Sequence, residues 1–165
     1  MWNLLEAKNL YKSFGNINAV SDISISLNVG EVIGFLGPNG AGKSTTMKML
    51  TGFLEADSGS IEIKKIDLSK DPINAKSIIG YLPEGAPSYS DMTVKSFLYF
   101  VGKMRGLKDE LLEKRLEIML KDINLSDVQN QIIETLSKGY KRRVGIAQAL
   151  ILSLIHISEP TRPRE

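Results

Sequence analysis

The sequence contains no cysteine, and this absence excludes two kinds of chemistry. Without thiols the chain can form neither disulfide bonds nor metal sites with thiolate ligands. Disulfide-stabilised proteins occur mainly in oxidising compartments, so a chain without cysteine fits a cytosolic location.

Excess charge and long hydrophobic runs are also missing. The 21 Lys and Arg residues nearly balance the 19 Asp and Glu residues, so the formal net charge is only +2. This balance gives no reason to expect nucleic acid as a partner, and no basic patch with interleaved aromatic residues is present. No apolar run approaches the roughly 18 residues of a membrane-spanning helix, and the first residues lack the regions of a signal peptide. We therefore expect a chain that neither crosses a membrane nor is exported.

The remaining composition is typical of a soluble globular protein. Of the 165 residues, 42% are hydrophobic and 24% are charged, which predicts one domain, or one domain with a subdomain. Alternating or short apolar runs predict strands in the first half of the chain. The predicted strands are residues 4–10, 23–29, 31–36, 60–63 and 78–82. The third is short and mostly apolar, as a buried parallel strand is.

Helical patterns accompany and follow these strands. Asp71 and Pro72 predict the start of a short helix. From residue 92 to residue 130 the apolar residues recur at helical spacing. Thr93 is the expected cap of one helix and Gly106 its expected end, and a second helix is predicted over residues 108–123.

Residues 37–45 match the pattern G-x-x-x-x-G-K-[ST] in full and lie between the apolar strand and a helical pattern. Glycines allow backbone conformations that a Cβ would forbid, so that consecutive N–H groups turn inward on a phosphate. The helix that follows points its positive end at the same phosphates. This context predicts a nucleoside triphosphate site rather than a Gly-rich turn with a chance lysine. Its residues are Gly37, Pro38, Asn39, Gly40, Ala41, Gly42, Lys43, Ser44 and Thr45.

Two side chains of this loop carry chemistry. Lys43 adds a mobile positive charge for the β and γ phosphates and is the predicted catalytic residue. Ser44 offers a hydroxyl to Mg²⁺. The loop therefore predicts a nucleoside triphosphate bound together with Mg²⁺.

A second motif occupies residues 136–150 and begins Leu-Ser-Lys-Gly-Tyr. Taken alone, Ser137 is a helix N-cap and Gly139 a turn residue. After a P-loop, the stretch resembles the L-S-G-G-Q signature of ABC ATPases and the helix that follows it. Lys138 stands at the first glycine of the signature and Tyr140 at its glutamine, but the L-S-x-G core remains. A P-loop GTPase or kinase would not explain this stretch.

Two shorter segments extend the resemblance. Residues 12–15, Lys-Ser-Phe-Gly, look like the adenine-stacking loop of the family, which makes Phe14 the candidate for packing on the base and Tyr11 the fallback. Residues 79–84 resemble the lead into its Q-loop, with Glu84 where most of the family has glutamine. A carboxylate at this position can ligate Mg²⁺, although it brings negative charge near the phosphates.

The resemblance to ABC ATPases covers roughly residues 3–150 and implies a fold. That fold is an α/β RecA-like P-loop NTPase core with an N-terminal antiparallel β subdomain and an inserted α-helical subdomain. The implied domains are residues 1–86 for the P-loop core with the β subdomain, 87–135 for the helical subdomain and 136–151 for the signature motif with its helix.

The resemblance also implies a function. In the family, two ATPase subunits face each other head to tail, and ATP with Mg²⁺ lies between the P-loop of one and the signature of the other. Ser137 and the N–H of Gly139 would thus contact the γ phosphate across that interface. Hydrolysis drives transport through a transmembrane permease, which implies a cytoplasmic subunit on the inner face of the cell membrane. Residues 80–107 and the Leu-Ser-Lys-Gly-Tyr stretch look most like ATPase subunits of ABC-2 type exporters.

The end of the chain departs from the family. A Walker B aspartate, a catalytic glutamate and a switch histidine are expected after Leu150, and they do not appear. Glu159 is not that glutamate, because Ser158 cannot replace the Mg²⁺-binding aspartate and the intervening segment is too short. Residues 152–165 instead resemble a translated sequencing adapter. On this hypothesis the segment is not native, His156 has no function, and the chain hydrolyses ATP negligibly although its full-length parent is an ATPase.

Two other functions stay open. A soluble ABC ATPase that works on ribosomes or DNA would usually carry a second cassette, coiled-coil insertions or basic extensions, and none is visible. A non-hydrolysing nucleotide-binding protein is favoured only if the native C-terminus lacks the Walker B residues.

We expect the DNA that encodes residues 152–165 to carry the adapter sequence. Sequencing that DNA checks the expectation directly. A reading frame that runs through this segment without the adapter sequence would exclude the hypothesis.

Overall fold

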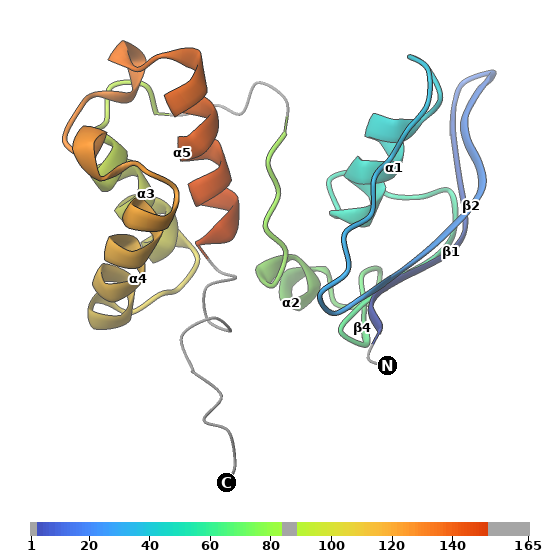
Figure 1. The fold of residues 1–165 in the computed structure, drawn as a ribbon. Helices are drawn as coiled ribbons and strands as arrows, with labels where there is room; N and C mark the ends of the chain where they lie inside the picture. Colours follow the sequence, from blue (N-terminus) through green and yellow to red (C-terminus); the bar gives the residue numbers. More distant parts are fainter. Residues whose placement is uncertain (1–2, 84–88, 152–165) are drawn as a thin grey trace, which may run out of the picture. The chain divides into compact units, whose positions relative to one another are not determined.

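The computed structural model of the protein describes residues 3–83 and 89–151 (Figure 1). The chain divides into two compact units, Met1–Ile78 and Ile79–Glu165. The first unit contains the P-loop and every strand of the described residues, and the described part of the second unit is helical. Within the ranges described, no helix is both long and apolar enough to cross a membrane.

The first unit is built on a four-stranded antiparallel sheet with the order β2-β1-β3-β4. The strands are β1 Asn3–Phe14, β2 Ile17–Asn28, β3 Ser58–Ile63 and β4 Ile66–Asp67. Helix α1, Lys43–Leu50, follows the P-loop, and the short helix α2 is Pro72–Ser77. Apolar side chains from the sheet and the helices are buried in this unit, namely Ala7, Leu10, Val20, Met49, Leu50, Ile61, Ile63 and Ala75.

The second unit contains helices α3 Val94–Met104, α4 Asp109–Asp122 and α5 Lys138–Leu150, with short 3-10 turns η1 Ser126–Val128 and η2 Ile133–Thr135. The three α-helices bury a shared apolar cluster that includes Phe97, Leu116 and Val144. Gly102 lets α3 approach α4, because a Cβ at this position would lie 2.3 Å from Cδ1 of Leu112. The unit therefore presents the N-terminus of α5 from a packed helical body.

Local sequence signals located most of these elements correctly. The strands predicted over residues 4–10, 23–29 and 60–63 fall in β1, β2 and β3 to within one residue. Thr93 caps α3 by accepting a hydrogen bond from the amide of Ser96 at 3.2 Å, and Asp71 caps α2 in the same way. Gly106 ends α3 with a left-handed φ of 81°.

Two predicted strands are wrong. Residues 31–36 and 78–82 form no strand, and Val32 and Leu36 are 94% and 96% exposed. A buried parallel strand needs hydrogen-bonded neighbours, whereas every pairing among the described strands is antiparallel. The apolar composition suits residues 31–36 for burial, but the described part of the chain supplies no strand to cover them.

We expect the exposed residues 31–36 to make this chain self-associate, because an extended apolar segment can pair with another chain. Val32→Glu should raise the monomeric fraction, measured by light scattering after gel filtration. Ile73→Glu is the control, because Ile73 is also exposed but lies in α2, where helical hydrogen bonds occupy the backbone. Equal behaviour of the two variants, or a monomeric parent chain, would contradict this expectation.

Candidate functional site

The backbone of the P-loop adopts conformations that favour glycine at two positions. Gly40 and Gly42 have φ values of 85° and 82°, in the left-handed region that residues with a Cβ rarely adopt. Space is also limiting at Gly42, where a Cβ would lie 2.3 Å from the carbonyl oxygen of Ala19 and 3.2 Å from Cγ2 of Val20. The loop therefore passes directly against β2 at the point where α1 begins.

The start of α1 is suited to an anion. Its N-cap is Gly42, which has no side chain to accept from the amides of the first turn, and no acidic residue lies in that turn. The positive end of the helix dipole is therefore not neutralised by the helix itself. One turn further on, the buried hydroxyl of Thr46 donates to the carbonyl oxygen of Gly42 at 2.9 Å and ties the loop to the helix. This arrangement matches helix N-termini that bind phosphate.

Lys43 is held against the same loop. Its Nζ donates to the carbonyl oxygens of Gly37 at 2.7 Å and of Pro38 at 2.6 Å. Ser44 follows at the exposed start of the helix. The structure thus gathers the ammonium, the hydroxyl and the helix N-terminus of residues 37–45 in one loop.

Phe14 is the last residue of β1, and its side chain is half exposed, at 50%. The strand register defines its face of the sheet. Lys12 pairs with Val20, and paired residues share a face. Val20 lies beside Gly42, and Phe14, two residues after Lys12, points to the same side. Tyr11 belongs to the opposite face by the same alternation, so Phe14 is the aromatic residue on the face that meets the P-loop.

Two charged residues beside Phe14 make contacts that the sequence did not reveal. Nζ of Lys12 lies 2.6 Å from Oδ1 of Asp57 and 5.8 Å from the centroid of the Phe14 ring. Hydrogen bonds from Lys12 and from the amide of Ser13 hold the pKa of the Asp57 carboxyl below its ordinary value. Because Lys12 and Asp57 lie far apart in the sequence, no local pattern could have paired them.

Ser137 caps α5 in the second unit, where its Oγ accepts from the amide of Tyr140 at 3.4 Å. Gly139 is exposed, and a Cβ at this position would meet nothing closer than Oγ of Ser137 at 3.9 Å. Packing within the unit therefore does not require a glycine there. Tyr140, at the glutamine position of the signature, packs against the helical core, and the guanidinium of Arg143 lies 5.2 Å from its ring centroid.

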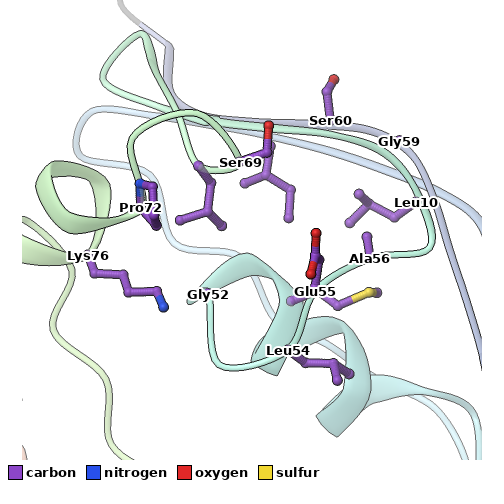
Figure 2. A pocket seen from close by; sticks show the side chains of 13 residues that line it. Leu10, Gly52, Leu54, Glu55, Ala56, Gly59, Ser60, Ser69, Pro72 and Lys76 are labelled. Carbon is purple, nitrogen blue, oxygen red and sulfur yellow. The ribbon is translucent and has the colours of Figure 1, made fainter.

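A pocket of about 480 Å³ lies elsewhere in the first unit (Figure 2). Leu54, Glu55 and Lys76 are among the side chains around it. None of the described residues that line it belongs to the P-loop, and Phe14 is not among them. The pocket lies by the C-terminal end of α1, whereas the P-loop precedes the N-terminal end.

The predicted site residues fall in two different units. Phe14 and the P-loop belong to the first unit, whereas Ser137 and Gly139 belong to the second, and each unit is defined by itself. Glu84 lies outside the described residues, as does the segment 152–165 with His156 and Glu159. The proposed roles of Glu84 and the adapter hypothesis therefore stay predictions.

Three features together define an incomplete α/β ABC ATPase domain. They are a P-loop that leads into a helix, an antiparallel sheet in the same unit, and an L-S-x-G motif whose serine caps a helix of the second unit. The chain belongs to the ABC transporter family, whose family model matches residues 20–161. That match includes residues 152–161.

Relatives agree with this assignment. The linearmycin resistance ATP-binding protein LnrL of Bacillus subtilis (strain 168) is 40% identical over 160 residues, which cover 96% of this chain and 51% of that protein. The lipopolysaccharide export system ATP-binding protein LptB of Escherichia coli (strain K12) is 37% identical over 161 residues, covering 94% of this chain and 67% of LptB. The solved structure of an ATP-binding subunit of an ABC transporter matches with a TM-score of 0.82 and 32% identity, covering 90% of this chain and 62% of that one. The chain spans about half the length of LnrL.

Gly42→Ala should destabilise the first unit, because the added methyl group would overlap the carbonyl oxygen of Ala19. The left-handed φ alone costs about 1 kcal/mol for alanine, and the overlap should add about 1–3 kcal/mol. Gly30→Ala is the matched control, since Gly30 has a φ of 81° but open space around its Cβ position. Thermal unfolding measures the stability of the two variants. Equal losses of stability would show that the close approach of the loop to β2 does not disfavour a Cβ at position 42.

Proposed function

We propose that the chain is the ATP-binding part of an ABC transporter subunit that binds MgATP and couples its hydrolysis to transport through a membrane partner. The observation that carries this proposal is the P-loop geometry, with left-handed glycines, the start of α1 and Lys43 held against the loop carbonyls. Membership of the ABC transporter family favours ATP as the nucleotide.

The residues of the loop fit a nucleoside triphosphate. Its N–H groups and the start of α1 suit the β and γ phosphates. Lys43, already beside the loop, supplies the positive charge that stabilises the transferred phosphoryl group. Ser44 would offer its hydroxyl to Mg²⁺, and Glu84 is proposed as a further ligand. Bound Mg²⁺ would neutralise negative charge that develops on the phosphates.

Phe14 is proposed to pack on the adenine. Its exposed ring and its position on the face of the sheet that meets the loop support this role. Aromatic rings stack on nucleobases because both present π faces. The opposite orientation of Tyr11 argues against it as the alternative.

A second ATPase subunit is proposed to complete the site. Glycine is a weaker helix former than alanine, and nothing within its own unit requires Gly139. Close approach of a phosphate to this end of α5 would explain the small residue at position 139. Ser137 and the N–H of Gly139 would then contact the γ phosphate that is bound to the other subunit.

A transmembrane permease is the proposed membrane partner, and export is the proposed direction. The name of LnrL refers to resistance and that of LptB to lipopolysaccharide export, and both fit a subunit that drives molecules outward. The subunit would be cytoplasmic and peripheral, bound to the inner face of the cell membrane through its permease.

The complete subunit is proposed to be longer than this chain, which covers only 51% of LnrL and 67% of LptB. The additional sequence would contain the Walker B aspartate, the catalytic glutamate and the switch histidine. It would also contain the strands that cover residues 31–36. We therefore propose that this chain, with a non-native segment 152–165, hydrolyses ATP negligibly, whereas the complete subunit is an ATPase.

Lys43→Ala in the complete subunit should weaken MgATP binding about tenfold to a hundredfold, because a charge-assisted hydrogen bond to phosphate is lost. Calorimetry measures the binding, and phosphate release measures the turnover. Lys48→Ala is the matched control, since it removes the same side chain from the exposed surface of the same helix. Unchanged binding and turnover in Lys43→Ala would contradict the proposed function.

A further inference from the structure

The carboxylate of Asp57 holds the end of β1 at two points. Its Oδ1 accepts from Nζ of Lys12 at 2.6 Å, and its Oδ2 accepts from the amide of Ser13 at 2.7 Å. The amide of Asp57 in turn donates to the carbonyl oxygen of Tyr11 at 2.9 Å. Asp57 is therefore bonded to three consecutive residues, directly before Phe14.

These bonds act where the neighbouring strand stops. The last residue pair between β1 and β3 joins Tyr11 to Ser58, and β3 begins at Ser58. Beyond this pair β3 no longer pairs with β1, and the Asp57 carboxylate instead accepts a hydrogen bond from the amide of Ser13. On the other side, β2 pairs with β1 as far as Phe14. The backbone at the strand end is thus held from both sides.

Lys12 connects this carboxylate to the aromatic ring. Its side chain is 15% exposed, although that of Asp57 is 45% exposed. The ammonium lies 5.8 Å from the ring centroid of Phe14, within the range of a cation–π attraction. Lys12 thus contacts both the Asp57 carboxylate and the Phe14 ring, while half of the Phe14 surface stays exposed.

We propose that Asp57 and Lys12 are positioning residues for the nucleotide base, forming an Asp57–Lys12 bracket that holds the Phe14 ring in the orientation for stacking on adenine. The inference rests on the proposed function, because it takes MgATP as the ligand of the P-loop. A side chain that is ordered before binding loses less conformational entropy when the ligand arrives. The bracket therefore raises the affinity for a nucleotide and leaves phosphate binding at the P-loop unchanged.

Binding of MgATP and of magnesium tripolyphosphate to the complete subunit separates this role from a general structural one, because tripolyphosphate lacks the base. Asp57→Ala should weaken MgATP binding about tenfold and change tripolyphosphate binding by less than about twofold. Phe14→Ala should likewise weaken the binding of MgATP and leave the binding of tripolyphosphate nearly unchanged. The double variant should bind MgATP no more weakly than Phe14→Ala alone, because both changes remove one interaction.

Substitutions of Lys12 test the ring contact without removing the bond from the amide of Ser13. Lys12→Met should weaken the binding of MgATP but not that of tripolyphosphate. Lys12→Arg keeps the charge and should bind MgATP as tightly as the unsubstituted subunit. Asp67→Ala is the matched control, because Asp67 accepts from the amide of Ser69 at 2.9 Å but lies in β4, which does not pair with β1. If Asp57→Ala fails to fold, Lys12→Met decides the question.

The possible failures are distinguishable. If the unsubstituted subunit does not bind MgATP, the proposed function is wrong. If binding depends on Lys43 but is unchanged in Phe14→Ala, or in both Asp57→Ala and Lys12→Met, the bracket alone is wrong. The bracket is also wrong if Lys12→Met weakens the binding of MgATP and of tripolyphosphate equally, because the substitution would then affect the phosphate loop.

Discussion

The approach of Gly42 to β2 is the constraint on which the candidate site depends. A loop held against the carbonyl of Ala19 is held against the whole sheet, because β2 is hydrogen-bonded to β1 and β1 to β3. This contact lies at the start of α1, where the phosphate loop leads into the helix. It also relates the loop to the end of β1, where Phe14 lies. One close backbone approach therefore connects the two parts of the candidate nucleotide site that are separate in the sequence.

Features that depend on neighbouring residues could be predicted from the sequence. The P-loop pattern, the caps at Thr93 and Asp71 and the end of α3 at Gly106 all arise from bonds or conformations within a few residues. Residues 31–36 show where this reasoning fails. Their apolar run predicts a buried strand, but Val32 and Leu36 are exposed, because a parallel strand exists only when neighbours pair with it. No local pattern states whether those neighbours are present.

Long-range contacts set a second limit. The Lys12–Asp57 ion pair joins the end of β1 to the residue before β3, and its partners are related by sheet register rather than by spacing in the sequence. Register shifts within β1 make this relation harder to infer from alternation alone. The family resemblance pointed to Phe14 as an aromatic residue near the base. It gave no physical reason for one ring orientation, whereas the proposed Asp57–Lys12 bracket supplies one.

The two interpretations of Ser137, as a helix cap and as a phosphate contact, do not compete. A serine hydroxyl has two acceptor lone pairs and one donor hydrogen. Capping uses an acceptor, because Oγ receives the amide of Tyr140. The donor hydrogen is still able to point at an anion, and the cap fixes the oxygen that carries it at the positive end of α5. The cap is thus a means of orienting the hydroxyl, and the open space around Gly139 is what would allow a phosphate to reach it.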